Sequence, residues 1–290
     1  MGVPDGRTRT PPVTQTAPGG LSLDAPAKVN LDLRVVGRRA DGYHLLESTV
    51  VLLELADRLL LLPGSNGLRV EGNASVDVPL DSSNLAWRGL VAGLGAEPEL
   101  VCLALEKRIP SAAGMGGGSS DAAAAWRLGR EMRRATEIPW PDAIRELAGI
   151  GADVPFFAAR IAAARLEGVG ERVTPIPVPA LEVVLLHPPL RLRTADVFTE
   201  LRPEEWGSGT NDLLLPAMRL APMIGELFAA ARAAGAEPRL TGSGPTVFAT
   251  SDDPERARDI GARLERAGVS VTITRTRRAA ASIERIIEED

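Results

Sequence analysis

One stretch of the chain combines residue types that could bind phosphate. Residues 110–125 read PSAAGMGGGSSDAAAA, so glycines precede two serines, an aspartate and a run of alanines. Glycine lets backbone N–H groups turn towards a ligand and lets the ligand come close. Because serine and aspartate begin helices and alanine continues them, a helix N-terminus with free N–H groups should follow. The pattern predicts a phosphate site, and the alternative is a plain glycine-rich turn before a helix.

The spacing of these glycines excludes two common nucleotide-binding motifs. No Gly-Lys-Ser/Thr follows them, as a Walker loop would require. The Rossmann spacing is absent, as is an acidic residue after a second strand. We name residues 110–120 the phosphate loop, and its expected phosphate-binding residues are Pro110, Ser111, Ala112, Ala113, Gly114, Met115, Gly116, Gly117, Gly118, Ser119 and Ser120.

A second group of candidates lies on an expected strand near the start of the chain. Residues 27–35 alternate apolar and polar side chains, which predicts a strand with Lys28 and Asn30 on the same face. A lysine on a strand is usually solvated. Asparagine is a weak strand former, however, and its position beside Lys28 favours a polar pocket.

Two further segments carry polar or aromatic side chains in unexpected surroundings. Residues 149–157, GIGADVPFF, put Asp153 within an apolar stretch, where a carboxylate is rare unless it is paired, functional or a helix cap. Residues 38–44, RRADGYH, form a turn at Asp-Gly followed by Tyr43, the only tyrosine, and His44. Core packing does not demand these two rings in a polar turn, although an ordinary hairpin aromatic is the alternative.

Composition limits the class of protein. The chain has 290 residues, 44% of them hydrophobic and 24% charged, as in a globular protein. Its net charge of -5 and pI of about 5.3 argue against a nucleic-acid partner. The single cysteine, Cys102, excludes an internal disulfide and a cysteine-based metal cluster. With no apolar run of about 18 residues and no signal peptide, we expect no membrane partner and a cytoplasmic location.

The expected elements divide the chain into three parts. Residues 1–20, rich in Pro, Thr and Gly, are expected to be a disordered leader. Residues 21–175 would form a domain around the phosphate loop, and residues 176–290 a second domain. In the second, periodicity predicts strands at 181–186, 239–241, 246–249 and 269–274 and helices at 212–220, 224–234 and 254–267. This βαββαβ order is that of ferredoxin-like domains, and its middle strands enclose Thr-Gly-Ser-Gly-Pro at residues 241–245, which we name the second glycine loop.

The order of these motifs resembles that of the GHMP kinases. The segments AKVNL (27–31), GRRADGYH (37–44) and GADVPF (151–156) are similar, more narrowly, to the family of 4-diphosphocytidyl-2-C-methyl-D-erythritol kinases. That family phosphorylates an alcohol in the non-mevalonate isoprenoid pathway. The resemblance runs from about residue 25 to the C-terminus. It implies an α+β, two-domain GHMP kinase fold, with an N-terminal ATP-binding domain and a C-terminal ferredoxin-like domain.

The resemblance also implies roles for the candidate residues. The phosphate loop would wrap the phosphates of ATP, with Ser120 as a contact for Mg²⁺. Asp153 would act as base on the substrate hydroxyl, with Lys28 beside it and Asn30 lining the same pocket. Phosphoryl transfer mainly requires such positioning and charge neutralisation.

Three aromatic residues would recognise the substrate base. By resemblance, Tyr43 would stack on the cytosine ring, His44 would hydrogen-bond to it, and Phe198 would cover its other face. The implied partner is a small-molecule cytidine diphosphate substrate, phosphorylated to the 2-phosphate by a monomer or homodimer.

Two alternatives stay open, and one segment departs from the family pattern. A homoserine or mevalonate kinase would explain the two glycine loops but not the Tyr43-His44 turn. A non-catalytic nucleotide-binding protein on the same scaffold would not need Lys28 and Asp153. After Phe157 the chain reads AARI (158–161), where relatives of this family usually carry glycine.

Overall fold

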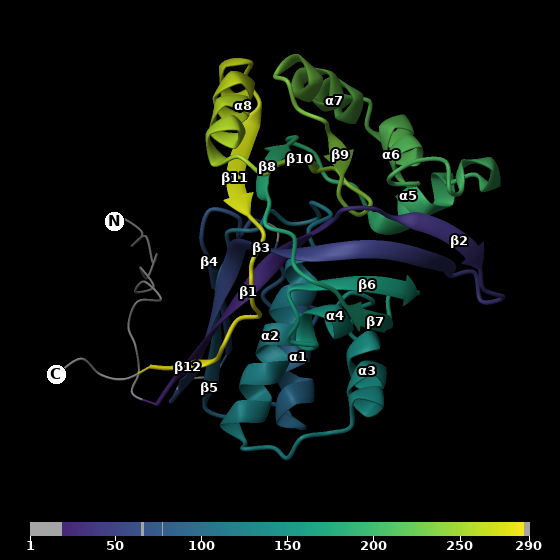
Figure 1. Cartoon of the computed structure of the whole chain (residues 1–290). Helices are drawn as coiled ribbons and strands as arrows, with labels where there is room; N and C mark the ends of the chain where they lie inside the picture. The colour runs from purple at the N-terminus through teal and green to yellow at the C-terminus, as the bar shows by residue number, and fades with distance from the viewer. Residues whose placement is uncertain (1–18, 65–66, 77, 287–290) are drawn as a thin grey trace, which may run out of the picture.

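The computed structural model describes residues 19–64, 67–76 and 78–286, and these residues form two β-sheets with helices packed on them (Figure 1). The leader expected at residues 1–20 lies outside the described residues except for Gly19 and Gly20. The combination of helices and sheets confirms the expected α+β class.

The first sheet is built around one long strand, β3, which pairs with β1, β2, β5 and β6. The path through the sheet is β12-β1-β3-β5-β4, with β7 paired to β6. Its strands are β1 (Leu21–Asn30), β2 (Arg34–Arg38), β3 (His44–Pro63), β4 (Gly67–Glu71), β5 (Val101–Glu106), β6 (Ala163–Gly168), β7 (Arg172–Pro175) and β12 (Glu284–Arg285).

An irregularity in β1 sets the direction of Lys28. The register of β1 on β3 shifts between Pro26 and Lys28. Before the shift Leu23 and Ala25 pack in the core beneath the helices, and after it Val29 packs in the core between the two sheets. A bulge of this kind turns the following side chains to the opposite face, so Lys28 faces the helices and the phosphate loop.

The alternation predicted over residues 27–35 is therefore interrupted. β1 ends at Asn30 and β2 begins at Arg34, and both pair with β3. Between them the Asp32 carboxylate accepts hydrogen bonds from Thr49 N at 2.7 Å and Thr49 Oγ1 at 2.8 Å. Between the two strands these side-chain hydrogen bonds take the place of some backbone hydrogen bonds to β3. The alternation of apolar and polar residues could not predict this interruption.

Four helices accompany the first sheet, and two of them pack unusually closely. They are α1 (Leu85–Leu94), α2 (Gly117–Met132), α3 (Trp140–Ala148) and α4 (Val154–Ala158). A Cβ at Gly89 or Gly93 of α1 would overlap the backbone of α2 at Ala122 or Trp126. The cap of α1 is Asn84, whose side chain accepts from Ala86 N at 2.8 Å.

The second sheet has the strand order β11-β8-β10-β9. Its elements are β8 (Glu182–His187), α5 (Thr194–Glu200), the 3-10 helix η1 (Pro203–Glu205), α6 (Leu214–Leu220), α7 (Met223–Ala233), β9 (Arg239–Leu240), β10 (Val247–Ser251), α8 (Pro254–Arg266) and β11 (Ser270–Arg275). The order βαββαβ, with the first strand beside the third and fourth, confirms the ferredoxin-like arrangement predicted from periodicity.

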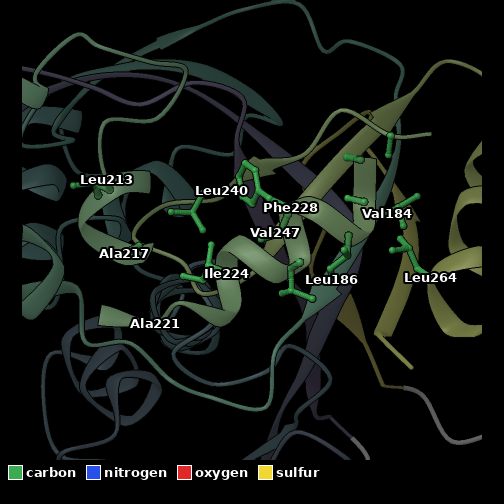
Figure 2. Close-up of a cluster of buried hydrophobic side chains, with 14 of the residues drawn as sticks. Val184, Leu186, Leu213, Ala217, Ala221, Ile224, Phe228, Leu240, Val247 and Leu264 are labelled. Carbon is green, nitrogen blue, oxygen red and sulfur yellow. The ribbon is translucent and has the colours of Figure 1, made fainter. Parts of the chain in front are cut away.

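The strand β8 of the second sheet is buried on both of its faces. Val184 and Leu186 of β8 point into the core covered by α7 and α8, where they lie near Ile224, Phe228 and Leu264 (Figure 2). The alternate side chains of β8, Val183 and Leu185, pack with Val29 and Val51 of the first sheet. The two sheets are thus joined by an apolar layer, which also contains Ala113 and Met115 of the phosphate loop.

The end of the chain returns to the first sheet. β12 pairs with β1 at Leu21 and Ser22, so a segment after the second sheet completes the first. The division into domains at residues 175 and 176 stays a prediction. Among the described residues no single helix is long and apolar enough to cross a membrane, although the bent pair α6 and α7, at 118°, has the length and composition when counted together.

Candidate active site

The phosphate loop and the second glycine loop meet backbone to backbone. A Cβ at Gly114 would overlap the carbonyl oxygen of Thr241 and lie 2.8 Å from that of Gly244. A Cβ at Gly242 would lie 2.9 Å from Gly114 O and 3.3 Å from Lys28 Nζ. Only glycine permits this approach, and it brings loops from both sheets next to Lys28.

The phosphate loop ends directly in the N-terminus of α2. Gly114 and Gly116 take left-handed backbone angles, φ 75° and 70°, and the helix begins at Gly117. Gly116 is the N-cap residue of this helix. The first turn therefore presents the free N–H groups of glycines and serines, with the partial positive charge of the helix end.

Lys28 and Asn30 form a buried polar pair, as their shared strand face predicted. Lys28 Nζ donates to Asn30 Oδ1 at 2.5 Å, and Lys28 N donates to Met115 O in the phosphate loop at 3.0 Å. Asn30 Nδ2 donates to Ser48 Oγ at 2.7 Å, while Asn30 N is 3.2 Å from Thr241 Oγ1. The two residues are only 5–6% exposed, so Lys28 is not solvated as a lysine on a strand usually is.

Asp153 lies beside this pair and is open to solvent. Its Oδ2 is 3.8 Å from Lys28 Nζ, and 40% of its side chain is exposed. Asp153 stands at the N-cap position of α4, but its side chain makes no capping hydrogen bond. Burial lowers the pKa of Lys28 from its ordinary value, and the Asp153 carboxylate acts in the opposite direction. The carboxylate is therefore paired with a lysine and still able to reach a ligand.

The segment that departs from the family pattern has a left-handed backbone without glycine. Arg160, which follows α4, has φ 59°. An arginine can adopt this conformation at a cost of about 1–2 kcal/mol. Where the resemblance implies glycine, this chain thus has an arginine in a left-handed conformation.

Two of the three expected aromatic residues are in contact. His44 stacks on Phe198, with ring centroids 5.1 Å apart and planes at 20°. Tyr43, at the tip of the hairpin between β2 and β3, is 65% exposed. Burial, with a smaller contribution from Arg38, lowers the pKa of His44, so its ring is neutral near pH 7 and can both donate and accept a hydrogen bond.

One aromatic neighbour was missed in the sequence. Trp206 meets His44 edge to face, with ring centroids 5.9 Å apart, and its buried indole N–H has no hydrogen-bond partner. Trp206 follows η1 in a polar segment, and an aromatic residue there was a usable signal because the chain has so few. Trp206 and Phe198 thus both contact the His44 ring.

A magnesium contact at Ser120 agrees with one observation. Ser120 Oγ is buried and has no hydrogen-bond partner. Within the described ranges, no three His, Cys, Asp or Glu side chains are grouped so that they could hold a metal ion. Mg²⁺ in phosphate-transfer sites is commonly held by few protein ligands together with substrate phosphates, so a single hydroxyl fits that role.

The comparisons with known proteins agree with this geometry. The models of the GHMP kinases N terminal domain and the GHMP kinases C terminal match residues 84–160 and 192–270. The 4-diphosphocytidyl-2-C-methyl-D-erythritol kinase of Nitrobacter winogradskyi is 40% identical over 280 residues, covering 84% of this chain and 89% of that protein.

Solved structures are similar as well. A crystal structure of 4-(cytidine 5'-diphospho)-2C-methyl-D-erythritol kinase is 35% identical, with a TM-score of 0.71 over 88% of this chain and 98% of its own. Homoserine kinase from Cytophaga hutchinsonii has a TM-score of 0.64 at 17% identity, over 94% of this chain and 100% of its own. The latter likeness concerns the fold alone.

The contact between the two glycine loops can be tested by adding one methyl group. Gly114→Ala should lower the free energy of unfolding by about 3 kcal/mol, because a left-handed alanine costs about 1–2 kcal/mol and overpacking a further 1–3 kcal/mol. Gly207→Ala is the control, since Gly207 has φ 67° but no atom within 4 Å of its Cβ position, and it should cost only about 1 kcal/mol. Chemical denaturation measures both, and equal losses would show that the close approach is unimportant.

Proposed function

The chain belongs to the GHMP kinases and, within them, to the family of 4-diphosphocytidyl-2-C-methyl-D-erythritol kinases, and from this membership we propose that it phosphorylates that compound with ATP to give the 2-phosphate. It is a small-molecule kinase of isoprenoid biosynthesis. The observation that carries the finer proposal is the Lys28–Asp153 pair between the two glycine loops, close to the first turn of α2.

The phosphate loop and α2 hold the nucleotide in this proposal. Backbone N–H groups of residues 114–119 donate to the phosphate oxygens, and the helix N-terminus favours their negative charge. Ser120 Oγ would hold Mg²⁺ bound with ATP, and the ion would neutralise charge on the phosphates. The close approach of the second glycine loop keeps the phosphate loop in place.

Asp153 is the base in the reaction. It accepts the proton of the substrate hydroxyl as that oxygen bonds to the γ-phosphorus, while the bond from the γ-phosphorus to the bridging oxygen breaks and ADP leaves. Lys28, whose Nζ lies 3.8 Å from Asp153 Oδ2, counters the charge of the transferring oxygens. Asn30 keeps Lys28 in position, because its Oδ1 accepts from Lys28 Nζ and its amide is held by Ser48.

Tyr43, His44 and Phe198 recognise the cytosine ring. A neutral histidine can match both the acceptor and donor groups on the edge of cytosine. Tyr43 on its exposed hairpin supplies a flat face. Because His44 and Phe198 are stacked in the structure, we propose that the base enters beside them and that Tyr43 closes over it. The cytoplasmic location and the monomer or homodimer stay predictions.

The base is tested by a single amide substitution. Asp153→Asn should reduce kcat on the order of 10²–10⁴-fold, because the proton acceptor is lost, while the affinity for ATP stays near that of the wild type. Asp142→Asn is the control, since Asp142 is exposed and pairs with Arg145 at 3.3 Å. Steady-state kinetics and calorimetric ATP binding measure the two effects. Wild-type turnover in Asp153→Asn would dismiss Asp153 as the base.

The cytosine assignment is tested on the hairpin. Tyr43→Ala should raise KM for the cytidine substrate about tenfold, because stacking a base on an aromatic ring is worth about 1–3 kcal/mol. Val36→Ala changes another exposed residue of the same hairpin and should leave this KM unchanged. A loss confined to ATP binding in Tyr43→Ala would contradict the assignment.

A further inference from the structure

Three buried charged side chains beneath the phosphate loop take no part in the chemistry described above. Lys107 lies where β5 leads into the loop, Asp121 lies in α2 just after the loop, and Asp57 lies on β3. Each is at most 3% exposed. Such groups are rarely buried unless they are paired.

Their contacts tie both ends of the phosphate loop to one strand. Lys107 Nζ donates to Asp57 Oδ2 and, at 2.6 Å, to Asp121 Oδ2. Asp57 Oδ1 also accepts from the backbone N–H groups of Arg108 at 2.6 Å and Ile109 at 2.8 Å. The residues before the loop and the residue after it therefore share one carboxylate–ammonium cluster.

The cluster lies directly beneath the start of α2. A Cβ at Gly117 would be 3.1 Å from Ile109 Cγ2 and 3.7 Å from Asp57 Oδ2. The first helical residue is thus in close contact with the residues that the Asp57 carboxylate holds. A shift of the cluster would move the N–H groups at the N-terminus of α2.

We propose that Lys107, Asp57 and Asp121 form a clamp that fixes the phosphate loop in its binding conformation before the nucleotide arrives. Lys107 and Asp121 are then positioning residues for ATP, and this rests on the proposed function because it assigns the phosphates to that loop. A buried ion pair is weak evidence for stability. A loop ordered in advance, however, lowers the cost of binding.

The clamp predicts a selective effect on the nucleotide. In Asp121→Ala, KM for ATP and Kd for a non-hydrolysable ATP analogue with Mg²⁺ should rise about tenfold, while KM for the alcohol substrate is unchanged. Asp121→Asn retains an acceptor oxygen for Lys107 and should restore both values. Glu131→Ala is the control, because it removes an exposed ion pair with Arg285, at 2.8 Å, from the same helix.

The outcomes separate the clamp from a structural role and from the proposed function. Equal analogue affinity in wild type and Asp121→Ala, or a rise in both KM values, would overturn the clamp. A wild-type protein that does not bind the analogue would overturn the proposed function instead.

If Asp121→Ala does not fold, hydrogen exchange of the wild-type protein tests the clamp. The backbone amides of Arg108 and Ile109 should then exchange slowly in the absence of nucleotide. Exchange as fast as at the exposed Ala96 and Glu97 would overturn the clamp.

Discussion

The site depends on a contact that leaves no room for a side chain. Gly114 of the phosphate loop lies against the carbonyl oxygens of the second glycine loop, and Gly242 lies against Gly114 O and Lys28. The apolar layer between the two sheets holds these loops at its border. Because this contact is between backbones, it leaves less freedom in the distance between the phosphate loop and the second glycine loop than side-chain packing would.

Charge is arranged around this contact according to burial. Lys28 is buried and hydrogen-bonded to Asn30, whereas Asp153 is partly exposed. The N-terminus of α2, which follows the phosphate loop, adds partial positive charge. The positive groups are therefore rigid and the carboxylate is accessible. In phosphoryl transfer, positioning and electrostatic stabilisation supply most of the catalysis, and both require groups that do not move when the substrate binds.

Local patterns predicted much of this arrangement. The glycine-serine loop before α2, the shared face of Lys28 and Asn30, and the βαββαβ order follow from backbone freedom and periodicity. The bulge at Lys28, the stacking of Trp206 beside His44 and the pairing of Lys107 with two aspartates could not be predicted. They depend on residues far apart in the sequence, whose contacts are set only when the sheets pack. The left-handed conformation of Arg160 was not predicted; the sequence showed only that glycine is absent from residues 158–161.

ATP consumption with three alcohols, 4-diphosphocytidyl-2-C-methyl-D-erythritol, homoserine and mevalonate, is the first measurement to make. We expect ADP formation with the cytidine compound and turnover of the other two about a hundredfold lower or still less, because a base pocket built from hydrogen bonds and stacking discriminates strongly against a substrate that leaves it unfilled. Comparable turnover of homoserine or mevalonate would keep the fold and contradict the substrate. Absence of turnover with all three would contradict the proposal that the Lys28–Asp153 pair transfers phosphate to this alcohol.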